Sequence, residues 1–343
     1  MATTTVYFAT NRKKDGTGQF GFGATGISMG TPATYAVADV KDVSLRDADS
    51  GTISNIHDVN AGDFSQNIKD QIIAAGRNLL IFIHGANNSF KNAIKRSAFN
   101  REWFADSTKA AADTTVIAFT WPSIDNFFKP PHTPLDAYKA DQTQAGKSNV
   151  HLAQFLMNIA QLRTAFVAAN PNRRIFLLAH SMGNYALQAA VQGSFDDHNP
   201  NDLILSQVFL AAPDEVPDTF ERPHGGRLSN LPKLSDRVAV YYSRRDALMI
   251  LSHVANGHDR LGFNGPTNKN DATKYPPAKF RLADCTGVLD YFPLIGEETH
   301  QYYRRSKKVR ADIVDCMVDH PRPAGGNIIL ETPIAGIDPG AIV

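Results

Sequence analysis

The sequence predicts an α/β protein built on a mostly parallel, eight-stranded sheet with helices on both faces. Eight short apolar stretches alternate along the chain with stretches in which apolar residues recur at helical spacing. The stretches in the middle of the chain contain almost no polar residues, as is typical of strands buried on both faces. This alternation of strand and helix predicts a doubly wound sheet.

The first half of the chain supplies four of the expected strands. Apolar runs such as "TVYFAT" and "LLIFIHG" predict strands at residues 5–10, 34–40, 79–85 and 114–121. Helical periodicity predicts helices at residues 64–75, 90–106 and 145–169.

The second half continues the same alternation. Strands are expected at residues 174–180, 206–212, 237–243 and 279–284, and helices at residues 182–193, 245–255 and 300–318. The strand "RIFLLAH" runs into the next helix without a spacer, which predicts a tight strand-to-helix turn.

One catalytic domain is expected over residues 1–320. Two stretches at about residues 122–144 and 256–278 are rich in Pro, Gly and Asn and are longer than ordinary connections, so they are expected to be lid-like insertions. Residues 321–343 are interpreted as a C-terminal extension, to which the sequence assigns no function.

Composition narrows the classes of function. The formal net charge is +1, so no general field attracts nucleic acid or an anionic membrane, and a small-molecule partner is expected. The two cysteines do not form a zinc ligand set, and neither a metal nor a cofactor is predicted. The N-terminal charges follow the short apolar stretch, and no run approaches eighteen apolar residues, which predicts a cytoplasmic protein without stable membrane insertion. The sequence does not predict an oligomeric state.

The segment "AHSMG" at residues 179–183 is typical of a nucleophile elbow. In the pattern G-x-S-x-G a serine occupies a strained turn between strand and helix, so the residues two positions away must be small. Ala179 replaces the first glycine and Gly183 is the second. The alternative is a serine that only caps the helix, since Ser is a favoured N-cap. On the first interpretation, Ser181 is the nucleophile.

A serine nucleophile needs a base and a group that orients the base. In this kind of fold the acid follows a later strand and the histidine follows the last one. Asp246 in "RRDAL" and His300 in "GEETHQYY" occupy these positions. Asp214 in "AAPDEV" follows the sixth expected strand and is the alternative acid.

The turn "HGANNSF" after the third expected strand is the candidate oxyanion hole. The backbone amide of Ala86 is expected to act together with that of Met182, which follows the nucleophile. The same residues also fit a simple turn in which Asn87 or Asn88 caps the next helix.

Several nearby side chains are candidates for the substrate-binding wall. His84 precedes the glycine of the oxyanion turn, and His180 is expected to pack locally or to line the floor of the pocket. Trp121, Phe127 and Phe128 lie where the fourth strand meets the first insertion; such aromatics are more often core residues, and the alternative is an acyl-binding wall.

Taken together, these motifs resemble a poorly characterised bacterial branch of the α/β-hydrolase superfamily that is usually labelled esterase or lipase-like. The resemblance rests on the elbow, "HGANNSF", "TWPS", "AAPDEV", "YYSRRDAL" and "THQYY" in this order, over roughly residues 3–318. It implies the α/β-hydrolase fold, a triad of Ser181, Asp246 and His300, and hydrolysis of a small-molecule carboxylic ester without a cofactor. Both acid-bearing motifs recur in this branch, so Asp214 remains an alternative to Asp246 as the acid of the triad, or a helper to it.

Two other classes of function fit the same residues. The triad could serve a thioesterase, lactonase, amidase or acyltransferase, because a fold does not dictate its substrate. A non-catalytic binding scaffold that retains the triad is the other alternative.

Overall fold

The computed structural model describes residues 3–16, 19–124, 133–194, 204–222, 226–291, 296–318 and 326–332. Within them, a ten-stranded sheet has the strand order β12-β11-β10-β9-β8-β6-β7-β1-β4-β5, and β2 and β3 form a small separate sheet. The strands are β1 Thr3–Thr10, β2 Arg12–Lys14, β3 Phe22–Ile27, β4 Thr34–Lys41, β5 Thr52–Ala61, β6 Asn78–Ile83, β7 Thr114–Thr120, β8 Ile175–His180, β9 Leu205–Ala211, β10 Ser235–Tyr242, β11 Phe280–Gly287 and β12 Gly326–Glu331. The α-helices are α1 Gln66–Ala74, α2 Phe90–Ala105, α3 Pro134–Lys147, α4 Asn149–Ala169, α5 Gly183–Ser194, α6 Ala247–Asn256, α7 Leu261–Asn264 and α8 Lys307–Val318.

The sheet is mostly parallel, as the sequence predicts. Every neighbouring pair from β12 to β1 runs parallel, and only the β1–β4 and β4–β5 pairs are antiparallel. All eight expected strands are present. The expected number of eight is too low for the whole sheet, because β5 and β12 extend it at its two edges. β5 exposes most of its side chains and β12 exposes half of them, so neither has the long continuous apolar run by which the other strands are recognised.

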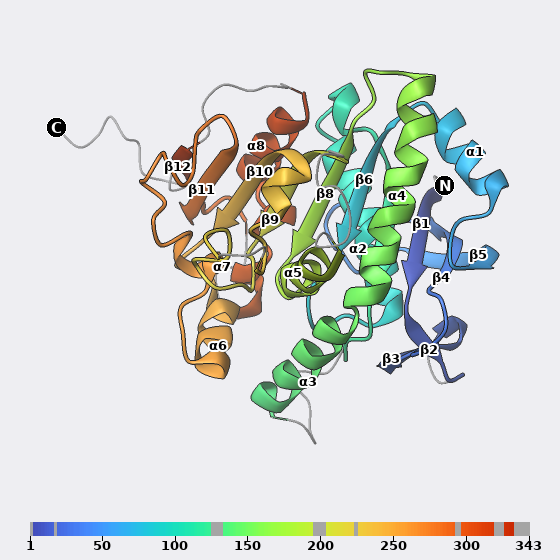
Figure 1. Cartoon of the computed structure of the whole chain (residues 1–343), viewed down its shortest axis with the longest axis horizontal. Coiled ribbons are helices and arrows are strands. Elements are labelled where there is room, and N and C mark those ends of the chain that lie inside the picture. The colour runs from blue at the N-terminus through green and yellow to red at the C-terminus, as the bar shows by residue number, and fades with distance from the viewer. Residues whose placement is uncertain are drawn as a thin grey trace.

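Helices cover both faces of the sheet (Figure 1). Along β6, Leu79, Ile81 and Ile83 pack into one core cluster with residues of α1, α3, α4 and α5, whereas Leu80 and Phe82 face a second cluster with residues of α2 and α8. This alternation follows from the two-residue period of a strand. Because both faces are covered, a central strand such as β6 must be apolar at every position.

The two expected insertions differ from simple loops. Residues 125–132 lie outside the described residues, but the chain is already helical from Pro134. Thr133 caps this helix by accepting a hydrogen bond from the amide of Asp136, and proline is favoured at the first helical position. Ser148 then separates α3 from α4. The predicted helix at residues 145–169 is therefore the end of one helix and the whole of the next.

The second insertion, residues 256–278, packs against the end of β9. The amides of Leu261 and Gly262 donate hydrogen bonds to the carbonyls of Glu215 and Pro213, at 2.7 and 2.8 Å. A Cβ atom on Gly262 would lie 2.6 Å from the backbone of Ala212, so only glycine fits this close approach. This insertion is a packed part of the domain.

The carboxyl ends of the parallel strands bring the candidate site residues to one edge of the sheet. Ser181 directly follows β8, and Ala86 follows β6. Asp214 follows β9, Asp246 follows β10, and His300 follows β11. Segments that are far apart in sequence thus meet where open α/β sheets bind their ligands.

Candidate active site

Ser181 occupies a strained turn between β8 and α5. Its φ is +55°, in the left-handed region that non-glycine residues rarely adopt. The neighbouring strand holds the turn, because the amide of Ser181 donates to the carbonyl of Ala211 at 2.9 Å. The carbonyl of Ser181 accepts from the amides of Asn184 and Asp214. These bonds fix the serine at the tip of the turn, with only 8% of its surface exposed.

The small residues around the serine are required by close backbone contacts. A Cβ atom on Gly183 would lie 2.6 Å from the carbonyl oxygens of both Ile83 and His84. A Cβ atom on Gly85 would lie 2.7 Å from the Cβ of Ser181. The turn after β6 and the turn after β8 therefore touch, and glycine is needed on both sides of the contact.

His300 and Asp246 form a buried pair. Nδ1 of His300 lies 2.7 Å from Oδ2 of Asp246, and the two side chains are 2% and 0% exposed. The other oxygen of Asp246 accepts from the amides of Leu248 and Met249 at the start of α6. Asp246 thus caps a helix and fixes the orientation of the imidazole at the same time. Nε2 of His300 is buried and has no hydrogen-bond partner within the described residues.

Asp214 takes part in a different network. Nε of Arg260 donates to Asp214 at 2.8 Å, and the hydroxyl of Tyr138 donates to it at 2.6 Å. The hydroxyl of Ser252 also donates to Asp214. The alternative acid therefore balances a buried arginine, whereas Asp246 is the acid that contacts His300.

The amides of Ala86 and Met182 are the expected oxyanion donors. Both residues line the same cavity as Ser181, and neither amide donates to a protein acceptor within the described residues. The next helix, α2, is capped by Ser89, which accepts from the amide of Asn92. The alternative in which Asn87 or Asn88 caps this helix is therefore wrong, because Ser89 has the required extended backbone.

A network that the sequence does not indicate holds the oxyanion turn. The side-chain amide of Asn88 donates to the carbonyls of Gly85 and Ala86, and its oxygen accepts from Arg96 at 2.5 Å. Arg96 in turn donates through two nitrogens to Asp49, at 2.6 and 2.7 Å. Asp49 precedes β5, so nothing in its local sequence connects it with this turn.

Asp141 of α3 supports the same turn from another direction. Its carboxylate accepts from the amides of Asn87 at 3.1 Å and Ile124 at 3.0 Å, and from the hydroxyl of Ser123. Burial raises the pKa of Asp141 to about 6, despite these hydrogen bonds. The oxyanion turn and the turn after β7 are thus tied together by one buried carboxyl group.

Two of the five candidate substrate-binding residues belong to the core. The rings of Trp121 and His84 stack at 5.0 Å, and both are buried. The indole of Trp121 donates to the carbonyl of His84, whose Nε2 accepts from the amide of Trp121. Neither residue lines the cavity. These mutual contacts turn both rings into the interior, so the substrate-wall position is wrong for His84, and for Trp121 the core position replaces the alternative of an acyl-binding wall. Phe127 and Phe128 lie outside the described residues.

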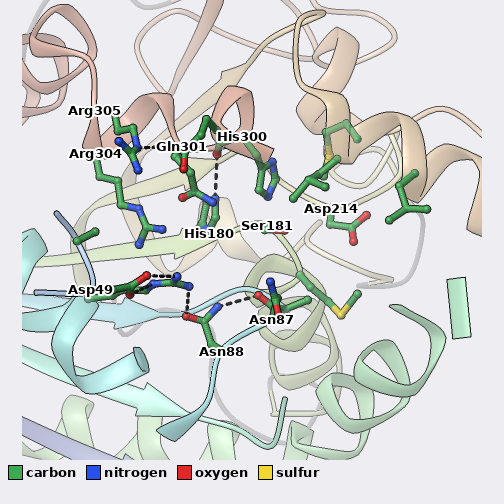
Figure 2. A pocket seen from close by; sticks show the side chains of 18 of the residues that line it. Asp49, Asn87, Asn88, His180, Ser181, Asp214, His300, Gln301, Arg304 and Arg305 are labelled. Carbon is green, nitrogen blue, oxygen red and sulfur yellow. Dashed lines mark hydrogen bonds and ion pairs between the residues drawn. The ribbon is translucent and has the colours of Figure 1, made fainter. Parts of the chain in front are cut away.

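His180 lines the cavity, as expected (Figure 2). Its Nε2 lies 3.2 Å from the carbonyl oxygen of His300, and its ring lies 4.6 Å from the His300 ring and 4.7 Å from the Tyr303 ring. Burial, followed by the nearby positive groups His300 and Arg304, lowers the pKa of His180 well below its ordinary value. His180 is therefore a neutral donor that supports the loop carrying His300.

The cavity at this edge of the sheet has a volume of about 130 Å³. Ser181 and His300 both face it, with Asp214 on one side and Arg304 on the other (Figure 2). Four helical residues add one aromatic and three other apolar side chains to its wall: Tyr138, Leu248, Met249 and Leu251. No residue of the insertion at residues 256–278 lines it. Among the described residues, no group of three or more His, Cys, Asp or Glu side chains is arranged to hold a metal ion, and no helix is long and apolar enough to span a bilayer.

The fold and the strained serine turn define an α/β-hydrolase. The chain belongs to the family described as "Alpha/beta hydrolase of unknown function (DUF900)", which matches residues 60–314. No protein with a curated description matches the chain.

Solved structures similar to the chain include esterases and lipases at low identity. A cutinase-like protein from Cryptococcus sp. is 15% identical, covers 74% of this chain and 97% of its own, and has a TM-score of 0.35. Aspergillus fumigatus lipase B is 13% identical, with 78% and 60% coverage and a TM-score of 0.35. Carboxylesterase CesB from Bacillus subtilis is 9% identical, with 84% and 89% coverage and a TM-score of 0.31. Similarities this distant carry no information about the substrate of this chain.

Proposed function

We propose that the protein is a serine esterase that hydrolyses small carboxylic esters through an acyl-enzyme intermediate. The observation that carries this proposal is the buried His300–Asp246 pair. Nε2 of His300 has no partner among the described residues, and His300 lines the same cavity as the strained Ser181. A base that is oriented on one nitrogen and unoccupied on the other is what a serine hydroxyl requires.

Acylation begins with attack on the ester carbonyl. Oγ of Ser181 forms a bond to the carbonyl carbon while Nε2 of His300 takes the hydroxyl proton. Asp246 stabilises the imidazolium through its 2.7 Å contact with Nδ1. The amides of Ala86 and Met182 donate to the oxyanion, which then collapses. The C–O bond to the alcohol breaks, and the alcohol leaves with the proton from His300.

Deacylation repeats these steps with water as the nucleophile. His300 takes a proton from water as the water oxygen attacks the acyl carbon. The bond to Ser181 Oγ breaks, the serine regains a proton from His300, and the carboxylic acid is released. No cofactor is needed for either half of this reaction.

The test is covalent labelling and turnover of the purified protein. A fluorophosphonate should label Ser181, as mapped by mass spectrometry, because only an activated serine reacts. Ser181→Ala should abolish labelling and lower kcat for a neutral para-nitrophenyl ester by about 10⁴-fold or more. Ser107→Ala, in a turn outside the cavity, is the matched control and should retain both the labelling of Ser181 and the wild-type kcat. Unchanged turnover in folded Ser181→Ala would reject the proposal.

A further inference from the structure

Arg304 is a buried cation in the wall of the cavity that holds Ser181. It is only 5% exposed, yet its guanidinium donates to no carboxylate or carbonyl within the described residues. Its Nε is fully buried without an acceptor. The guanidinium carbon lies 5.7 Å from the centroid of the Tyr303 ring, in a cation–π arrangement. Figure 2 shows Arg304 reaching into the pocket beside His180.

The other cations around the cavity have carboxylate partners. Both oxygens of Asp49 accept from Arg96, so this acid is already engaged. Nε of Arg305 lies 2.6 Å from Glu298. Among the side chains that the structure describes, these two pairs leave Arg304 without an ion-pair partner.

The other acids that line the cavity or lie next to it are either engaged or solvated. Asp214 pairs with Arg260 at 2.6 Å, and Asp246 contacts His300. Asp47 lines the cavity but is exposed, so water solvates its charge. Among the carboxylates whose side chains the structure describes, none forms an ion pair with Arg304.

A buried arginine without a counter-charge is unusual in a folded protein, since taking a charge out of water is unfavourable unless it is paired. Burial is the main cause that lowers the pKa of Arg304, and the neighbouring Arg96 and Arg305 add to it, whereas Tyr303 and Asp49 act in the opposite direction. Arginine also presents a planar set of donors that matches carboxylate and phosphate groups. Such a residue in a substrate cavity is arranged to receive an anion.

The location of Arg304 places this anion away from the reacting bond. His180 lies next to His300 in the cavity wall, and Arg304 follows His300 by four residues on the same loop. A second cavity of about 160 Å³ shares Ala48, Arg304 and Arg305 with the first, so Arg304 lies where the two meet. A substrate held by this guanidinium would extend from it towards Ser181.

We propose that the substrate is an ester carrying a second, anionic carboxylate, which Arg304 binds while Ser181 attacks the ester carbonyl. This inference rests on the proposed esterase function and specifies its substrate class. The charge can belong to the acyl part or to the alcohol part of the ester, and the experiment separates the two.

The test compares esters that differ only in this charge. In the first pair, mono-para-nitrophenyl adipate carries a free carboxylate on the acyl side, and its methyl diester lacks that charge. In the second pair, para-acetoxybenzoate carries a free carboxylate on the alcohol side, and its methyl ester lacks it. In the wild-type protein, kcat/KM for the anionic member of one pair should exceed that of its neutral partner by about tenfold or more, because a charge-assisted hydrogen bond is gained. Equal values in both pairs would overturn the proposal.

Substitutions then assign the preference to Arg304. Arg304→Gln should lower the anionic-to-neutral ratio of kcat/KM by about 10- to 100-fold, and Arg304→Lys should retain part of it. Arg222→Gln removes a half-exposed arginine outside this cavity and is the matched control, with the wild-type ratio expected. Circular dichroism establishes that each variant is folded. A wild-type ratio in folded Arg304→Gln would overturn the proposal.

A binding measurement separates this inference from the esterase proposal. Adipate should bind to Ser181→Ala in isothermal titration calorimetry, and Ser181→Ala with Arg304→Gln should bind it at least about tenfold more weakly. If Ser181 is not labelled and no ester is cleaved, the esterase proposal fails, while Arg304-dependent adipate binding would still support the anion site. Equal adipate binding by both variants would overturn the anion site and leave the esterase proposal standing.

Discussion

Asp246 uses its two carboxylate oxygens for two different purposes. One accepts from the first amides of α6, and the other contacts Nδ1 of His300. The position of the imidazole is therefore tied to the start of a helix, which is a rigid element. At the residue scale, this explains how a side chain on a short 3₁₀ turn, Gly296–His300, is held in a fixed orientation.

Asp246→Asn tests the role of this acid. We expect kcat for a neutral ester to fall by about 10³- to 10⁴-fold, because an amide neither fixes the correct imidazole tautomer nor stabilises the imidazolium. Asp214→Asn is the comparison. It should mainly lower the free energy of unfolding, by about 3–5 kcal/mol, because it leaves Arg260 buried without its partner. Steady-state kinetics and urea unfolding measure the two effects. The opposite pattern would assign the orienting acid to Asp214.

At the element scale, three segments meet through one carboxyl group. Asp141 links α3 to the oxyanion turn at Asn87 and to the turn after β7 at Ile124. Its pKa of about 6, against an ordinary value of 3.8, means that the folded state binds this proton more tightly than the unfolded chain does. The bound proton contributes its full stabilisation at pH values below the pKa that Asp141 has in the unfolded chain. This stabilisation is lost as the pH rises through the pKa that Asp141 has in the folded protein.

This linkage predicts a pH-dependent difference between the wild-type protein and Asp141→Asn. The free energy of unfolding of the wild type, measured relative to the variant, should fall by about 3 kcal/mol between about pH 4 and about pH 7. Above that range the difference should be constant. Urea denaturation across the range measures it, and a difference that does not change with pH would contradict the raised pKa.

At the scale of the whole molecule, the C-terminal segment completes the sheet. β12 pairs in parallel with β11, from Arg281 opposite Gly326 to Asp284 opposite Ile329. Leu330 of this strand packs into the core cluster that includes α8. Without β12, the backbone groups along one side of β11 would be unpaired, and an unpaired edge strand favours association between chains.

Two truncations test this contribution. A chain ending at Val318 should lose about 2–3 kcal/mol of the free energy of unfolding through loss of the apolar burial at Leu330, and it should self-associate. A chain ending at Thr332 retains β12 and is the control. Thermal unfolding and size-exclusion chromatography measure both effects. Equal stability and size of the two truncated proteins would show that β12 is dispensable.

The sequence by itself determined the parallel core, the strand-to-helix turn at Ser181, and the positions after the strands where acids and histidines occur. These features are local: a strand covered on both faces must be apolar throughout, and a strained turn must be flanked by small residues. The edge strands β5 and β12 escaped detection because strands that are largely exposed carry no such constraint.

Only the tertiary structure decided which side chains meet. It paired His300 with Asp246 and Asp214 with Arg260, turned His84 and Trp121 into the core, and left Arg304 in the cavity without an ion pair among the side chains that the structure describes. The physical reason is that hydrogen bonds and ion pairs depend on distances between segments far apart in the chain, and no local pattern encodes those distances. Asp49 and Arg96, which are 47 residues apart in sequence and 2.6 Å apart in space, illustrate this.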